Sequence, residues 1–347
     1  MTKIRIYLVL FIFVLAGFAM KSCQKDKTPR KLDLNLTYKG IELLPAVNLI
    51  TGAAFDPLQE VSNNAISLSP RGLVYPGMDT ILYDMAGLYW GEKTGGVEDQ
   101  IGWAQVRGMQ VMLKPIVDFQ DNITLPSEYN AGSEAEWDIF ESAYTKFITH
   151  FAKVADSLNC EVLCIGDDFE YFAENRPSYW LTLIDTVREI YSGKITYAAD
   201  WDDYDQIVFW DLLDYIGVNA YFPLHSEATP SVEEIEDSWL TTVIPDLESF
   251  QADQGIPVIF TEFGYRSSDF AANEPWNTDS LGEVNETGQY NVLLGLFNAF
   301  DGKTWFEGGF VREWDLENVN AGGSQDDGFT IQNKSGEQLI YLIYSSN

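Results

Sequence analysis

The chain has 347 residues, 46% of them hydrophobic and 14% aromatic, and its formal net charge is −32. This size and apolar content allow a large core and suit a single elaborated α/β domain. The negative field repels phosphate backbones and anionic lipid surfaces, which argues against a nucleic-acid partner and favours a neutral ligand. His150 and His225 are the only histidines, which leaves almost no material for histidine-rich metal sites or Ser–His–Asp triads.

Residues 1–22 have the features of a targeting segment rather than of a folded domain. Lys3 and Arg5 form a basic start, an apolar stretch follows, and a short junction precedes Cys23. The apolar stretch is short for a membrane span. We predict a bacterial lipoprotein signal peptide with Cys23 as the lipidated residue. The alternative is an ordinary signal peptide that leaves a spare thiol at this position.

Residues 23–36 are predicted to form a polar tether, and residues 37–347 a single folded domain. This prediction places the protein in the bacterial cell envelope, at the periplasmic or outer-membrane surface, with the lipid as its only attachment to the membrane. Two other cysteines, Cys160 and Cys164, lie four residues apart in an expected strand. Four strand steps span roughly 13 Å, which is too far for a disulfide, so we expect two core thiols.

Short apolar runs alternate with amphipathic stretches along the domain, which is the pattern of strand–helix units. We expect strands at 38–41 or 46–50, and at 80–84, 110–114, 161–166, 194–198, 214–219, 258–262 and 305–311. We expect helices at 96–107, from 133, from 177, at 204–212, from 231, and at 286–300 and 339–344. Ser133 and Ser231 begin capping boxes, and Pro245 is expected to kink or end its helix. Eight expected strands that alternate with helices predict a single-domain (β/α)8 barrel.

In such a barrel the active site gathers at the C-terminal ends of the strands. The residues that end the expected strands are mainly carboxylates and large aromatics. Sugars stack their apolar faces on aromatic rings while polar side chains bind their hydroxyls, so this set predicts a saccharide site. For each aromatic residue the alternative is simple packing within a loop. The set comprises Asp84, Trp90, Lys114, Asp118, Asp167, Asp168, Glu170, Asp200, Trp201, Asn219, Tyr221, Glu262, Tyr265, Trp314 and Asp315.

Glu262 is the central residue of this set. It ends an apolar run that lies between Pro257 and Gly264 and is typical of a strand buried on both faces. An unpaired carboxylate at that position is too costly to bury, so it must face a site or a cationic partner. The alternative to a functional role is therefore a salt bridge with the nearby Arg266.

Several motifs together resemble glycoside hydrolase family 113, the β-mannanase-type members of a large retaining (β/α)8 clan. The resemblance covers roughly Lys39 to the C-terminus and is carried by residues 108–115 with Asp118, and by 164–166, 196–202, 209–211, 214–224 and 260–266. It implies hydrolysis of β-mannosidic bonds with retention of configuration. It also implies a nucleophile on the seventh strand, which corresponds to Glu262, and an acid/base on the fourth strand.

The chain departs from the family pattern at three polar positions. Asp168 stands where the family has a glutamate acid/base, Ile116 where it tends to have a polar residue, and Asp200 where it usually has asparagine. Retaining hydrolysis needs two carboxyl groups about 5–5.5 Å apart, and aspartate is shorter than glutamate by one methylene. Three outcomes are open: Asp168 reaches the substrate, Glu170 enters the site instead, or catalysis is lost and binding is kept.

We predict a retaining glycoside hydrolase acting on a β-linked, mannan-type glycan, with Glu262 as nucleophile and Asp168 as acid/base. The alternative is a catalytically impaired glycan-binding lipoprotein. We expect no cofactor and no metal, since this chemistry needs only carboxylates. The expected partner is a neutral oligo- or polysaccharide, and the protein is expected to be a monomer. The predicted substrate-binding residues are Lys114, Asp118, Asp200, Trp201, Tyr221, Trp90, Trp314 and Tyr265.

Overall fold

The computed structural model describes residues 32–78, 80–121, 124–279 and 281–346. The predicted signal peptide and Cys23 lie outside these residues. The described end of the predicted tether differs from the expectation, because Leu32, Leu34 and Leu36 are buried in the hydrophobic core. The folded part of the chain therefore begins before residue 37. Among the described helices, none combines the length and apolar character that crossing a membrane requires.

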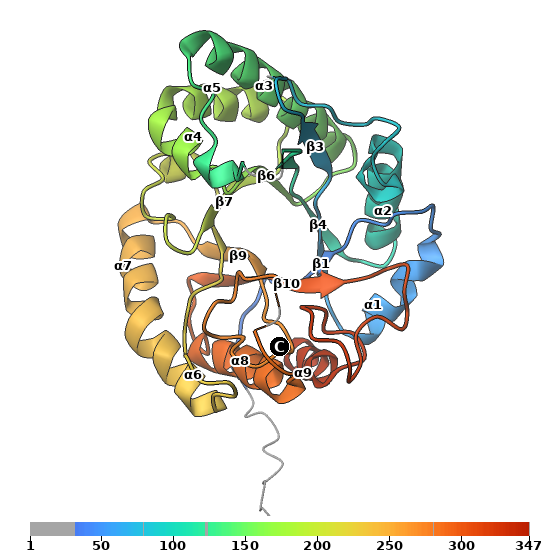
Figure 1. The fold of residues 1–347 in the computed structure, drawn as a ribbon, viewed down its shortest axis with the longest axis vertical. Coiled ribbons are helices and arrows are strands. Elements are labelled where there is room, and N and C mark those ends of the chain that lie inside the picture. The colour runs from blue at the N-terminus through green and yellow to red at the C-terminus, as the bar shows by residue number, and fades with distance from the viewer. Residues whose placement is uncertain (1–31, 79, 122–123, 280, 347) are drawn as a thin grey trace, which may run out of the picture. The chain divides into compact units, whose positions relative to one another are not determined.

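Eight parallel strands close into a barrel at the centre of the described domain (Figure 1). Each strand pairs in parallel with a neighbour on either side, which confirms the predicted (β/α)8 barrel. In ring order the strands are β1 (Tyr38–Leu43), β2 (Ala65–Leu68), β4 (Gln110–Leu113), β6 (Val162–Asp167), β7 (Lys194–Asp200), β8 (Ile216–Asn219), β9 (Val258–Phe263) and β10 (Phe306–Trp314).

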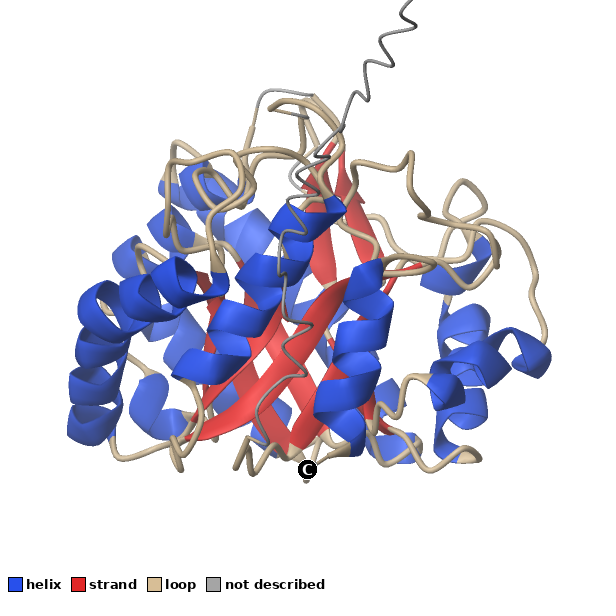
Figure 2. Ribbon diagram, turned by 90° about the horizontal axis from the view of Figure 1, so that it is seen from below, coloured by secondary structure: helices blue, strands red, loops and turns tan. Residues whose placement is uncertain are grey.

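Helices cover the outside of the ring, as Figures 1 and 2 show. Two additional strands, β3 (Arg71–Val74) and β5 (Ile116–Phe119), pair in parallel as a small separate sheet. The α-helices are α1 (Asp56–Glu60), α2 (Thr94–Gln105), α3 (Glu134–Ser157), α4 (Glu170–Asn175), α5 (Pro177–Arg188), α6 (Val232–Ser238), α7 (Ile244–Gln254), α8 (Glu286–Ala299) and α9 (Ser335–Ser345).

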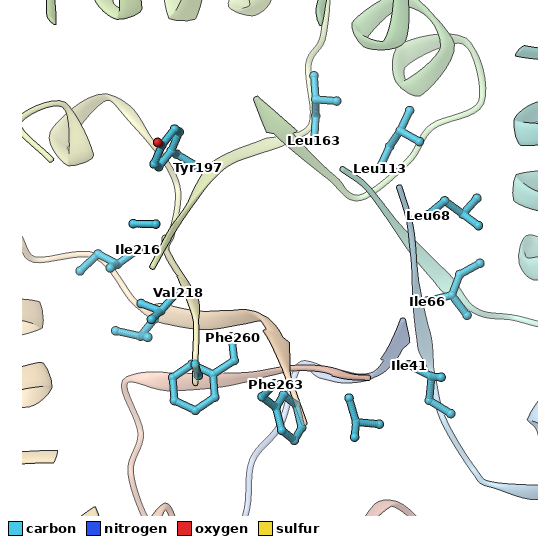
Figure 3. Packing of buried hydrophobic residues seen from close by; sticks show 14 of the residues in the cluster. Ile41, Ile66, Leu68, Leu113, Leu163, Tyr197, Ile216, Val218, Phe260 and Phe263 are labelled. Carbon is cyan, nitrogen blue, oxygen red and sulfur yellow. The ribbon is translucent and has the colours of Figure 1, made fainter. Parts of the chain in front are cut away.

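Successive side chains of each strand point alternately into the barrel and out toward the helices. Figure 3 shows the outward set, in which Leu163, Val218 and Phe260 point away from the ring. A separate buried cluster fills the interior. Because both faces are apolar, the strands form nearly continuous apolar runs in the sequence. The inner cluster consists of Tyr38, Ala65, Met112, Val162, Cys164, Ala198, Tyr215, Ile259 and Phe310.

The prediction of the second strand is wrong. Residues 80–84 form only an isolated bridge, between Leu82 and Leu73, and the second barrel strand is β2. The prediction failed because residues 80–84 contain the continuous apolar run Ile81 to Tyr83, whereas residues 65–68 are interrupted by Ser67. The expected helix at 204–212 is also wrong, since only Trp210–Leu212 form a 3₁₀ turn. Of the two possible first strands, the one at 38–41 is confirmed.

The predicted helix starts are confirmed where capping chemistry defines them. The Ser133 side chain accepts a hydrogen bond from the Glu136 backbone N–H, and Ser231 accepts one from Glu234. Pro245 lies in the first turn of α7, directly after a π-helical segment that interrupts the helix begun by α6. Cys160 and Cys164 are buried free thiols, as expected.

Candidate active site

The alternation that fills the core also gathers polar side chains at the C-terminal end of the barrel. Met112 belongs to the inner cluster, so Lys114, two residues later, has the same inward direction. Asp200 of β7 pairs in register with Asn219 of β8, and Asn219 pairs with Glu262 of β9. Polar side chains from three consecutive strands therefore lie side by side at this end.

One extra residue in β9 turns Glu262 toward the barrel interior. Val218 of β8 pairs with Phe260, but the next residue, Asn219, pairs with Glu262, so Thr261 is an insertion in the ladder. Without this bulge, Glu262 would share the outward direction of Phe260. The Thr261 hydroxyl donates to Asn219 Oδ1 at 2.8 Å, which fixes the orientation of the amide. Bulges commonly re-aim side chains next to active sites.

A second irregularity in β6 positions the neighbouring acids. Cys164 pairs with Thr196 of β7, and Asp167 pairs with Ala198, so three steps along β6 match two along β7. Asp167 Oδ1 then accepts a hydrogen bond from Asn219 Nδ2 at 3.1 Å. The strand ends there, and the chain leaves the barrel at Asp168.

Two cations and a phenol surround the Glu262 carboxylate. Lys114 Nζ donates to Oε2 at 2.5 Å, and the Tyr221 hydroxyl donates to Oε1 at 2.7 Å. Arg312 Nη1 lies 3.7 Å from Oε1 and donates to the Tyr221 oxygen at 3.2 Å. The Glu262 side chain is 13% exposed. Its partners hold it in one position while part of the side chain stays accessible.

The alternative prediction, a salt bridge between Glu262 and Arg266, names the wrong cation. Arg266 pairs instead with Asp327 at 3.1 Å. The cation that contacts Glu262 most closely is Lys114, which is itself buried. Lys114 Nζ also lies 3.5 Å from Asp167, so one ammonium group lies within ion-pair distance of both acids.

These contacts keep Glu262 ionised. Burial raises the pKa of this carboxyl, but the Lys114 and Arg312 charges and the hydrogen bonds outweigh it and lower the pKa to about 2. Burial likewise lowers the pKa of Lys114, while Asp167, Glu262 and Glu42 hold it well above its usual value. At neutral pH the pair is therefore a carboxylate and an ammonium ion.

The pKa of Asp168 is shifted in the opposite direction. Burial, followed by the nearby carboxyls of Asp200 and Asp167, raises the pKa of Asp168 to about 9. Its Oδ1 is buried and has no hydrogen-bond partner among the described residues. Its backbone is in the left-handed region, with φ of 54°, which costs a non-glycine residue on the order of 1–3 kcal/mol and is concentrated at functional sites.

Two carboxyl groups at the same end of the barrel thus differ in protonation. Glu262 on β9 is an ionised base with a fixed orientation, and Asp168 after β6 is a protonated acid. The Glu262 charge also contributes to raising the pKa of Asp168, after burial and the nearer aspartates. Such a pair can supply a nucleophile and a proton donor to one substrate. Among the described residues, no group of three or more His, Cys, Asp or Glu side chains could hold a metal ion.

A model of Glycoside Hydrolase Family 113 matches residues 81–334, which is more than half of the chain. The chain belongs to this family.

Solved structures agree with this assignment at the level of the fold. The β-mannanase AaManA of family 113 from Alicyclobacillus acidocaldarius, solved with ManMIm, is 24% identical with a TM-score of 0.75, over 91% of this chain and 99% of that one. A family 113 β-1,4-mannanase is 22% identical with a TM-score of 0.77, over 90% of this chain and all of the other (100%). A Faecalibacterium prausnitzii β-glucuronidase is 14% identical with a TM-score of 0.60, over 89% and 49%. Among proteins with curated descriptions, none matches significantly.

Lys114, Tyr221 and Asp200 lie at the same end of the barrel as Glu262, but not all of them make the contacts that the sequence predicts. Lys114 and Tyr221 were predicted to bind substrate, and both are buried and bonded to Glu262, so they position that carboxylate. The carboxyl of Asp200 has its pKa raised to about 7 by burial and by Asp167 and Glu262. Glu170, the alternative acid, is exposed as the first residue of α4.

Two other predicted substrate-binding residues contact residues that lie outside the cluster around Glu262. Asp118 belongs to β5 in the small outer sheet, where Arg71 Nη1 lies 3.4 Å from its carboxylate. The prediction assumed a loop after the third strand, whereas the chain there forms β5. Trp90 is partly buried and stacks on Trp103 of α2, with ring centroids 5.8 Å apart.

The remaining predicted aromatics divide into buried and accessible ones. Trp314 is 3% exposed and Tyr265 1% exposed, so neither offers a ring face to a sugar in this structure. Both rings therefore pack in the interior, which was the alternative to sugar binding for each aromatic residue. Trp201 is partly buried and stacks on Trp276, with centroids 5.4 Å apart and an interplanar angle of 14°.

Arg312 and Glu42 belong to the site and were missed by the sequence analysis. Phe310 is in the inner cluster, so its two-residue spacing to Arg312 was a usable signal. Glu42 Oε1 lies 3.9 Å from Lys114 Nζ. Burial, with the Glu262 charge, raises the pKa of Glu42 to about 7.

Proposed function

We propose that this protein is a retaining glycoside hydrolase that cleaves β-linked, mannan-type glycans by a two-carboxylate double displacement. The observation that carries the proposal is the geometry of Glu262, which Lys114 and Tyr221 bind at the barrel end where Asp168 leaves β6; the pKa of Glu262 is lowered and that of Asp168 is raised. Family membership supports glycoside hydrolysis, and the β-mannanase neighbours support the sugar.

In the first step, a Glu262 carboxylate oxygen attacks the anomeric carbon while Asp168 gives its proton to the departing glycosidic oxygen. A glycosyl ester on Glu262 and a free sugar hydroxyl result. In the second step, Asp168 takes a proton from water, whose oxygen attacks the same carbon and releases Glu262. Two inversions give overall retention.

Lys114 and Tyr221 support both steps through their contacts with Glu262. Their hydrogen bonds stabilise the free carboxylate at the start and again when it leaves the sugar. Both groups fix the carboxylate before substrate binds, so little reorganisation is needed during reaction. The raised pKa of Asp168, to about 9, keeps on its carboxyl the proton that a leaving oxygen would take.

One observation favours a second candidate function. Both oxygens of Glu262 already accept hydrogen bonds, as in a carboxylate whose role is structural. A glycan-binding protein with an impaired site would show the same arrangement. A binding protein holds oligosaccharides without turnover, so enzyme assays distinguish the two.

The test uses β-1,4-mannohexaose and 4-nitrophenyl β-mannoside with the wild type, Glu262→Gln, and Glu248→Gln as a matched control. Glu248 is a surface acid paired with Lys303, so its variant should keep full activity. We expect turnover with a β-configured first product by NMR, and its loss in Glu262→Gln. Binding without turnover would select the second candidate, and an α-configured first product would exclude the double displacement.

We also propose that the mature protein is held in the bacterial cell envelope by a lipid on Cys23. The composition of residues 1–22 supports this. A Cys23→Ser variant of the full chain should move from the membrane fraction to the soluble fraction. An unchanged distribution would contradict the anchor.

A further inference from the structure

The aromatic stack formed by Trp201 and Trp276 ends in an unusually exposed ring. Trp276 is 44% exposed, although tryptophan is highly buried on average. One of its faces is supported by Trp201, with the rings 14° from parallel. Trp201 in turn packs edge-on against Phe222, which is buried. Trp276 is therefore the outer member of a supported stack.

The stack lies beside the candidate catalytic residues. Trp201 directly follows Asp200, the last residue of β7. Asp200 pairs in register with Asn219, and Asn219 pairs with Glu262. The inner end of the stack thus begins one residue from the ring of polar groups that contains the nucleophile.

The segment that carries Trp276 is tied to the domain. The Ala272 carbonyl accepts a hydrogen bond from Leu224 N at 2.8 Å, and Arg266 donates to the Thr278 carbonyl. Asn277 Nδ2 donates to Glu274 at 3.0 Å. These bonds flank the tryptophan on both sides, so its ring has a defined place although the residue stays 44% exposed.

We propose that Trp276 is a sugar-stacking residue of an accessory subsite, which holds a pyranose unit of the same β-linked glycan next to the unit that is cleaved. The inference rests on the proposed function and adds a preference for oligosaccharides over single sugars. A flat, supported, solvent-facing indole suits the apolar face of a pyranose ring. The ligand is neutral, which agrees with the strong negative charge of the chain.

The test compares Trp276→Ala, Trp276→Phe and Tyr341→Ala on β-1,4-mannohexaose and on 4-nitrophenyl β-mannoside. Tyr341 is a matched control, because it is an aromatic residue of α9 with 41% exposure. In Trp276→Ala we expect kcat/KM for mannohexaose to fall about tenfold, which corresponds to about 1.4 kcal/mol, mainly through a higher KM. The aryl mannoside should be unaffected, Trp276→Phe should keep most of the activity, and the control should match the wild type.

The remaining outcomes separate this inference from the proposed function. If the wild type cleaves mannohexaose and Trp276→Ala leaves its KM unchanged, or impairs both substrates equally, the subsite is refuted and the hydrolase proposal stands. If the wild type binds mannohexaose without turnover, calorimetric Kd values replace KM, with the same tenfold expectation. If it neither binds nor cleaves mannohexaose, both proposals fail.

Discussion

Replacing Lys114 with methionine would remove the main charge that keeps Glu262 ionised. Its ammonium lies 2.5 Å from Glu262, 3.5 Å from Asp167 and 3.9 Å from Glu42. Breaking a buried ion pair by removing one partner typically costs about 3–5 kcal/mol. At about 1.4 kcal/mol per pKa unit, this corresponds to an increase of roughly 2–4 units. The pKa of Glu262 would therefore rise from about 2 to roughly 4–6.

The pH dependence of kcat/KM on 4-nitrophenyl β-mannoside measures this change. Above pH 3 the wild type should show no acidic limb that belongs to Glu262, whereas Lys114→Met should lose activity below roughly pH 4–6. Lys334→Met is the matched control, because Lys334 is also buried and pairs with Asp326 at 2.7 Å. It should lower stability and leave the acidic limb in place.

The reasoning would be refuted by a folded Lys114→Met protein whose acidic limb coincides with that of the wild type. In that case Arg312 and Tyr221 alone would suffice to keep Glu262 ionised. A limb that moved equally in the Lys334→Met control would indicate a general loss of stability rather than a local electrostatic effect.

Asp168→Asn should reduce kcat/KM, which reports the first step, by about 10²–10⁴-fold on mannohexaose but much less on a glycosyl fluoride, whose leaving group needs no proton; equal losses of kcat/KM on both would remove Asp168 from the acid role. Tyr221→Phe loses a hydrogen bond to a charged group worth about 1.5–3 kcal/mol, so the acidic limb should move up by about 1–2 units, and an unmoved limb would count against the contact. Folding raises the pKa of Asp200 from 3.8 to about 7. As the pH rises above 3.8, Asp200 loses its proton in the unfolded chain but keeps it in the folded protein, so folding stability declines until about pH 7. In urea unfolding, Asp200→Asn should reduce that decline between pH 5 and pH 8 by on the order of 2 kcal/mol, whereas an identical decline would contradict the raised pKa.

Much of the barrel could be predicted because its strands are buried on both faces. The runs that became β4 and β6 to β10 are apolar and bounded by turn residues, so their places are visible in the sequence. Residues 65–68 and the strands β3 and β5 are interrupted by Ser67, Gly72 and Asp118 respectively, so no continuous apolar run marks them as strands. Their existence depends on pairing with distant parts of the chain.

The site was predictable to the extent that strand ends determine it. Glu262 and Asp168 follow from position, although their catalytic roles stay predictions. The bulge at Thr261 that turns Glu262 inward has no sequence signature, because it adds one residue without special composition. Aromatics at strand ends are equally suited to packing and to binding, which is why Trp314 was assigned to substrate and proved to be buried.

Covalent trapping of Glu262 tests the central claim most directly. The wild type would be incubated with 2-deoxy-2-fluoro-β-mannosyl fluoride, in which the fluorine slows the second step and the fluoride leaves without protonation. Two-carboxylate retention predicts a stoichiometric fluoroglycosyl adduct on the peptide that contains Glu262, with loss of activity and no adduct in Glu262→Gln. An adduct on another residue, or turnover of mannohexaose by a protein that is never labelled, would contradict the assignment of Glu262 as the nucleophile.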